Sequence, residues 1–385
     1  MFKKLVHLFI GPDADHNTAT SGLVVGRPGH AMHLFATVGG IVADEGALHA
    51  VYACKGASGL KPCLLCTNVY AADGRDIVAR DATGTSVPHT CADSSRLRLH
   101  TRATVAAVLR ALSEQAAQPK SKGKLEELET RLGWRHDPGA LLADGWLLPH
   151  VHPALTCIFD WMHVVFVNGV FGAAVGQLMG FAMNKDNGFK KRGFSYAAMN
   201  AAIEGFTWPK LVGKGPRDVF SPKRAASHWE AAAFKASASE GLSVAPFMLY
   251  FVQRAAAAIN DAELTRHVLC FAMLCGIVQS LHGAHRGGVN TDALQGDINA
   301  LLAEFKHLYG EGAMAPKCHY RFCFATSHAL ASSLQRAMMP MKVAMTTTMS
   351  MMATTTIHSL LAPMMTMKTA MATMAMTTTM TTKIA

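Results

Sequence analysis

The sequence predicts an α/β protein that is mainly helical overall. Residues 33–43, HLFATVGGIVA, form a continuous apolar run rich in small and β-branched residues, as in a buried strand. Most later apolar residues recur at three- and four-residue spacing, which indicates helices with one buried face. The chain has 385 residues, 50% of them hydrophobic, enough for two or three domains with real cores.

The first elements are predicted in a simple order. Asp44 directly follows the strand at 33–43, and the next segment, EGALHAVYA, has helical composition, so Asp44 lies where a strand ends and a helix begins. Residues 54–100 are rich in Gly, Pro, Cys, His and Asp and predict loops. Residues 101–118 carry apolar residues at helical spacing and predict an amphipathic helix, with a second helix beginning at KLEELETRLGW.

The second half is predicted to be helical around one very apolar segment. Residues 164–183 are long and apolar enough to span a bilayer. Polar residues stand at or within this run, and such residues are costly in lipid, so we expect a buried core helix and no membrane partner. Further helices are predicted roughly at 224–258, 260–282 and 291–309.

Composition narrows the class of protein. The formal net charge of +10 favours polyanionic partners. Nine cysteines without a disulfide-like framework indicate a reducing compartment. The apolar run near the N-terminus is too short for a signal peptide, and we expect a nuclear protein. Residues 338–385 contain 14 methionines and 14 threonines without Asp or Glu, so we expect this tail to be disordered.

A Cys-x-x-Cys at Cys63 and Cys66 is the most specific local motif. Two thiols in one turn suit half of a tetrahedral zinc site, and PHTCADSSRLRLH supplies the remaining candidates His89, Cys91 and His100. The alternative is a pair of half-buried structural thiols. A redox pair is disfavoured because no thioredoxin-like βαβ pattern surrounds the motif.

Several other residues carry weaker signals. Asp160 and His163 are three positions apart and share a helix face, where they could orient a scaffold or help a nearby metal. The alternative is that Asp160 caps the helix and His163 is a core histidine. Glu240 stands before an apolar helix, either as a metal-binding carboxylate or as an N-terminal helix charge. Lys317 and His319, in MAPKCHY, could contact phosphate or substrate, or serve only in packing.

Residues 184–224 combine nine basic residues with interleaved aromatics, a pattern that fits a nucleic-acid surface and equally fits an ordinary solvated loop. The basic residues expected to contact nucleic acid are Lys190, Lys191, Arg192, Lys210, Lys223 and Arg224.

Taken in order, the motifs resemble one family. Asp44 after an apolar strand, KGASGLKPCLLC, FDWMH, FKASASEG and PKCHY resemble the transposases of CACTA-type and Plavaka-type DNA transposons, over roughly residues 20–325. The resemblance implies a ribonuclease-H-like core that binds Mg²⁺ or Mn²⁺, with DNA as the partner and a homo-oligomer as an open possibility. It implies catalytic carboxylates at Asp44 and Glu240, and structural roles for Asp160 and His163.

The resemblance also implies how the chain is divided. Residues 1–53 would be a partial ribonuclease-H-like core, and residues 54–223 a large helical insertion with a zinc knuckle. Residues 224–337 would carry the third-carboxylate helix, ahead of the tail. The first catalytic carboxylate has no counterpart before Asp44, so we expect an N-terminally truncated remnant that does not cleave DNA. The alternative is a non-enzymatic, zinc-stapled helical protein that binds nucleic acid or other proteins.

Overall fold

The computed structural model describes residues 2–11, 18, 23–25, 32–119, 122–209, 215–287, 290–314, 317–319 and 375–383. Helices account for 64% of the chain and strands for 6%, so the prediction of a mainly helical protein is confirmed, and the strands form only small sheets. The chain divides into two compact units. The first comprises residues 1–68, 98–159 and 326–385, and the second comprises residues 69–97 and 160–325.

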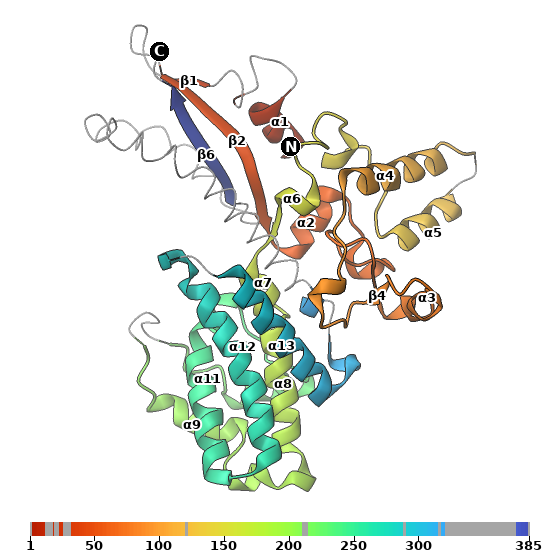
Figure 1. Ribbon diagram of the computed structural model, residues 1–385. Coiled ribbons are helices and arrows are strands. Elements are labelled where there is room, and N and C mark those ends of the chain that lie inside the picture. The colour runs from red at the N-terminus through yellow and green to blue at the C-terminus, as the bar shows by residue number, and fades with distance from the viewer. Residues whose placement is uncertain are drawn as a thin grey trace. The chain divides into compact units, whose positions relative to one another are not determined.

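The first unit contains a small mixed sheet built around β2. Strand β2 (Met32–Ala43) pairs antiparallel with β1 (Leu23–Val25) and parallel with the short β5 (Cys157–Phe159). On the other side β2 pairs antiparallel with β6 (Ala375–Lys383) (Figure 1). The predicted strand is therefore present, and Ile41 and Ala43 near its end are buried. The sequence analysis did not anticipate β6, and most of the tail lies outside the described residues, so its overall disorder stays a prediction.

Helices and loops complete the first unit. Asp44 ends β2 and caps the helix that follows, as predicted for the strand–helix junction. The amphipathic helix predicted at 101–118 corresponds to α4 (Arg102–Ala116), and the helix predicted after it corresponds to α5 (Lys122–Leu132). The helices of this unit are α1 (Phe2–Ile10), α2 (Glu45–Tyr52), α4 (Arg102–Ala116), α5 (Lys122–Leu132) and α6 (Pro153–Thr156).

The second unit is a helical bundle. Helix α12 (Ala262–Gly287) contacts α8 (Val170–Met183), α11 (Ala238–Ile259) and α13 (Thr291–Tyr309). These helices run alongside one another in Figure 1. Its core is strongly aromatic, with Phe171 1% exposed and its ring centroid 5.5 Å from that of Phe271. The main helices are α7 (Trp161–Val165), α8 (Val170–Met183), α9 (Tyr196–Glu204), α10 (Pro222–Glu230), α11 (Ala238–Ile259), α12 (Ala262–Gly287) and α13 (Thr291–Tyr309). Residues 69–97 add short elements: α3 (Arg75–Arg80), β3 (Val69–Tyr70) and β4 (Val87–Pro88).

The apolar segment 164–183 is interrupted between α7 and α8. Asn168 has a positive φ of 47°, and a Cβ at Gly169 would lie 2.3 Å from the carbonyl oxygen of Val164, so the chain can turn here only with glycine at 169. Nine residues of α8 are buried, in agreement with the expected core helix. By length and composition, three helical segments are apolar enough to cross a membrane: Trp161–Met183, Ala238–Ile259 and Ala262–Ala284.

The segment predicted as one helix at 224–258 is two helices. Helix α10 ends before Ala232, which has a φ of 46°, and α11 begins after Ser237, whose hydroxyl accepts a hydrogen bond from the Glu240 amide. A positive φ and a new capping serine stop and restart a helix, although the apolar spacing continues across them. The predicted boundaries of residues 1–53, 54–223 and 224–337 stay a prediction, because a compact unit can combine segments from both sides of such a boundary.

Candidate metal centre

The turn Cys63–Cys66 is buried and shaped like half of a metal site. Cys63 is 1% exposed and Cys66 is 0% exposed, and the two leucines between them are buried to the same degree. The Leu65 amide donates a hydrogen bond to Cys63 Sγ, at 3.4 Å. A backbone amide that points at a cysteine sulfur favours the thiolate, the form of cysteine that binds metal.

Backbone hydrogen bonds hold this turn against the chain at 98–100. The His100 amide donates to the Leu65 carbonyl at 2.8 Å, and the Thr67 amide donates to the Arg98 carbonyl at 2.8 Å. Cys66 and Leu99 form an isolated antiparallel bridge. The turn is thus tied on both sides to residues about 33 positions away in the sequence, which fixes the direction of its two sulfurs.

The loop that leads into the turn is anchored at the end of α5. The Lys55 amide donates to the Gly133 carbonyl at 2.8 Å, and the Leu60 amide donates to the Thr130 carbonyl at 2.8 Å. Gly133 has a φ of +77°, and a Cβ there would lie 2.1 Å from the Lys61 carbonyl oxygen. Only glycine permits both this backbone conformation and this close approach.

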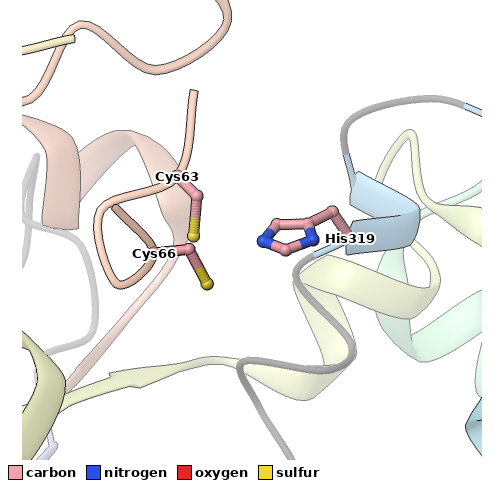
Figure 2. Close-up of side chains that lie close together, drawn as sticks. All are labelled: Cys63, Cys66 and His319. Atoms are coloured by element: carbon pink, nitrogen blue, oxygen red, sulfur yellow. The ribbon is translucent and has the colours of Figure 1, made fainter. Parts of the chain in front are cut away.

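The sulfurs of Cys63 and Cys66 lie within 4.8 Å of one another, and both residues are buried in the first unit. Figure 2 shows the two thiols on the turn and also draws His319, a buried histidine that belongs to the second unit. The pair of thiols could supply half of a metal site, which agrees with the expectation of zinc. The structure gives no support to Mg²⁺ or Mn²⁺ at this site.

The donor set suits zinc in particular. Zinc bonds of about 2.3 Å to sulfur and about 2.0 Å to nitrogen place neighbouring tetrahedral ligands about 3.5 to 3.8 Å apart. Two sulfurs within 4.8 Å of one another need only a small contraction to reach that geometry. Thiols are also soft ligands, which bind zinc in preference to hard cations such as Mg²⁺.

The sequence analysis named Cys63 and Cys66 as metal ligands, and both lie in this buried turn. It named His319 as a possible contact to phosphate or substrate. This histidine is buried in the second unit, and its role stays a prediction.

Among the described residues, none of the three other predicted zinc ligands forms a metal-binding group with the two cysteines. The Nε2 atom of His89 is 3.1 Å from the Met314 carbonyl oxygen, and burial lowers the pKa of this imidazole. The thiol of Cys91 donates to the Asp93 carbonyl at 3.4 Å. Both residues belong to the second unit. His100 belongs to the first unit, and its backbone amide donates a hydrogen bond to the Leu65 carbonyl in the Cys63–Cys66 turn.

Two further buried cysteines pack in the core of the first unit. Burial raises the pKa of Cys54 to about 12, and its thiol donates to the Gly133 carbonyl at 3.3 Å. Burial also raises the pKa of Cys157, on β5, well above its usual value. A raised pKa makes a thiol a poorer metal ligand, because the thiolate is the form that binds metal.

The predicted catalytic carboxylates are both engaged as helix caps. The side chain of Asp44 accepts a hydrogen bond from the Ala47 amide at 2.7 Å, at the start of α2. Glu240 forms a capping box with Ser237 at the start of α11. The guanidinium of Arg224 binds both oxygens of Glu240, at 2.9 Å and 3.3 Å, and holds the pKa of this carboxyl below its usual value. The two carboxylates belong to different units, and their convergence stays a prediction.

The Asp-x-x-His motif has a local structural role. Asp160 caps α7 by accepting a hydrogen bond from the Met162 amide at 2.9 Å, and its other oxygen binds Nδ1 of His163 at 2.5 Å. The side chain of His163 is 41% exposed, so it is a capped surface residue more than a core residue. Lys317 donates to the Val167 carbonyl at 2.7 Å and thereby joins its helix to the α7–α8 turn.

The predicted nucleic-acid residues fall into two groups. Lys190, Lys191 and Lys223 are exposed on the second unit. Arg192 instead donates to the Ile259 carbonyl at 2.8 Å, and Arg224 is held by Glu240, so both are occupied in the fold. Lys210 lies outside the described residues.

Comparison with known proteins adds no relative. None of the protein-family models, curated proteins or solved structures matched this chain. Its function therefore has to be argued from the site and the sequence order.

Proposed function

We propose that this chain is a zinc-stapled, nucleic-acid-binding protein of transposase-like ancestry that does not itself cleave DNA. The observation that carries the zinc part is the buried Cys63–Cys66 turn, whose two sulfurs lie within 4.8 Å of one another. Zinc there would be structural, because it would hold together loop-rich segments that have little core of their own.

The transposase-like ancestry is supported by the order of motifs and by one feature of the sheet. Asp44 directly follows β2, and β2 pairs in parallel with β5, the strand that precedes Asp160. Carboxylates at the ends of parallel strands are where such a core would hold its catalytic metal ions. A ribonuclease-H-like core is part of the proposal on this basis.

The absence of cleavage is argued from the state of Glu240. Two-metal phosphoryl transfer needs carboxylate oxygens that are free to bind the cations. Both oxygens of Glu240 are bound to Arg224, and one of them also accepts from the Ser237 amide at 3.1 Å. To bind a metal ion, this carboxylate would have to give up an ion pair and a helix cap together.

The nucleic-acid part rests on charge. The formal net charge is +10, and Lys190 and Lys191 are neighbouring exposed lysines on one short helix. Exposed lysines bind phosphate through electrostatic attraction and counterion release, which makes the affinity strongly dependent on salt.

Fluorescence anisotropy with a labelled DNA duplex at several salt concentrations tests this part of the proposal. We expect the double variant Lys190→Glu/Lys191→Glu to bind more weakly, with a salt slope lower by about 2, since each lost phosphate contact removes about 0.9. Lys122→Glu, an exposed lysine at the start of α5, serves as the matched control. Binding that is insensitive to salt, or equally weakened by both changes, would contradict the assignment.

A further inference from the structure

A pocket of about 430 Å³ opens on the first unit between α4 and the chain that follows α5. Small-molecule sites in proteins occupy about 300 to 1,000 Å³, so a ligand of moderate size would fit. One wall is a single face of α4, whose lining residues recur at helical spacing: Ala106, Leu109, Arg110 and Ser113. The opposite wall comes from residues 135–138 and from the turn at 142–148.

Backbone hydrogen bonds fix the wall opposite α4. The Arg135 amide donates to the Ala53 carbonyl at 2.7 Å, and the His136 amide donates to the Glu129 carboxylate at 2.8 Å. At the other end of this wall, the carboxylate of Asp144 accepts from the Trp146 amide at 3.0 Å. A pocket whose walls are already held in place loses little conformational freedom when a ligand enters.

The pocket has an apolar floor and a basic rim. Leu112 is 1% exposed and Leu142 is 2% exposed, whereas Arg110 and Arg135 are exposed at the rim. Within the part of the chain that the structure describes, neither of these two guanidinium groups forms an ion pair. Two arginines on one pocket without a carboxylate partner are therefore available to a ligand.

The balance of charge favours an anion. Asp137 is the one acidic residue among those that line the pocket, and its Oδ1 accepts from the Gly139 amide at 2.8 Å. A phosphate monoester carries nearly two negative charges at neutral pH and presents three acceptor oxygens, so it can bind two guanidinium groups at once. A carboxylate has one charge and two oxygens and would occupy a single arginine.

We infer that this pocket binds a phosphate monoester whose organic part is about the size of a nucleoside. Arg110 and Arg135 would bind the phosphate, and Leu112 and Leu142 would lie beneath the organic part. A free nucleotide and the phosphorylated end of a nucleic-acid strand share this chemistry. The inference goes beyond the proposed function and depends on neither the Cys63–Cys66 turn nor the lysines of the second unit.

Isothermal titration calorimetry of the full chain with adenosine 5′-monophosphate and with adenosine tests the inference. We expect adenosine to bind at least about tenfold more weakly, because it lacks the charged group. Arg110→Gln and Arg135→Gln should each weaken binding of the nucleotide about 10- to 100-fold, since each removes charge-assisted hydrogen bonds. Arg131→Gln, which changes an exposed arginine of α5 outside the pocket, is the matched control and should leave the affinity unchanged.

Asp137→Asn tests the charge argument in the opposite direction. The asparagine keeps an oxygen that can accept from the Gly139 amide but removes the negative charge at the rim. Binding of the nucleotide should become about two- to tenfold tighter, and binding of adenosine should stay the same. A nucleotide affinity that falls in this variant, with the fold intact by circular dichroism, would contradict a phosphate at this site.

Oligothymidylate with and without a 5′-phosphate distinguishes the two sources of the phosphate. Preference for the phosphorylated strand that Arg110→Gln abolishes would identify a strand end, and binding of the mononucleotide alone would identify a free nucleotide. The Lys190→Glu/Lys191→Glu variant should retain nucleotide binding, so failure of the nucleic-acid surface would leave this inference standing. The inference is wrong if neither phosphate-bearing probe binds at millimolar concentration, or if both pocket arginines can be replaced with no more effect than Arg131→Gln.

Discussion

Substitution of Gly176 by alanine tests whether α8 is a buried core helix. A Cβ at position 176 would lie 1.9 Å from the Ala232 carbonyl oxygen and 2.8 Å from the Ala233 Cα. Both neighbours are backbone atoms, so they cannot move aside by changing rotamer. The two segments would have to separate by about 1.5 Å to restore ordinary contact in a close-packed interior.

The expected cost follows from two opposing terms. Overpacking of this kind costs about 1 to 3 kcal/mol or more, while replacement of glycine by alanine within a helix gains about 1 kcal/mol. Since backbone atoms form the obstacle, we expect a net loss of about 2 kcal/mol in the free energy of unfolding. For a unit of this size that corresponds to a melting temperature lower by about 4 to 8 °C.

Gly180, one turn further along α8, provides the matched control. A Cβ there meets nothing within 4 Å, so Gly180→Ala should be neutral or stabilising by up to about 1 kcal/mol. Thermal unfolding followed by circular dichroism measures both variants against the parent. Equal stability of the two variants would mean that α8 does not pack against residues 231–234, and that this apolar helix has some other environment.

Two further predictions concern the carboxylates. Glu240→Gln should lower stability by about 1 kcal/mol at neutral pH, because the ion pair with Arg224 is one-third exposed, whereas Glu230→Gln at the exposed end of α10 should have no effect. Since the folded pKa of Glu240 is lowered, its contribution is present above the unfolded value of about 4.3 and is lost as pH falls through the lower folded pKa. Denaturant unfolding measured at several pH values should show this dependence for the parent and not for Glu240→Gln. Asp44→Ala should remove a helix cap and about 1 kcal/mol of stability, and neither it nor the parent should nick DNA with Mg²⁺ or Mn²⁺. Nicking by the parent that Asp44→Ala abolishes would restore the enzymatic interpretation.

Local patterns predicted the elements whose causes are local. The strand at 33–43 is an uninterrupted apolar run, and Asp44 follows it with a side chain suited to capping, so the strand and the junction could both be predicted. The helices at 102–116 and 291–309 have apolar residues at helical spacing and agree closely with the predictions. These features depend on residues within a few positions of one another.

Features set by contacts between distant segments could not be predicted. Strand β6 lies in a Met/Thr-rich tail and is defined by its pairing with β2, more than 300 positions earlier. Arg224 was predicted to contact DNA and Glu240 to bind a metal ion, but in the fold these two side chains form an ion pair with each other. The hydrogen bonds that hold the Cys63–Cys66 turn against residues 98–100 also join distant segments, and nothing in the spacing of the sequence predicts them.

Metal analysis of the purified chain tests the central claim most directly. The chain should contain one equivalent of zinc after exhaustive dialysis against metal-free buffer. The Cys63→Ser variant should lose that zinc. The Cys91→Ser variant should retain it, because it changes a different buried thiol, which donates a hydrogen bond to the Asp93 carbonyl. A metal-free parent, or a Cys63→Ser variant with its full zinc content, would contradict the account.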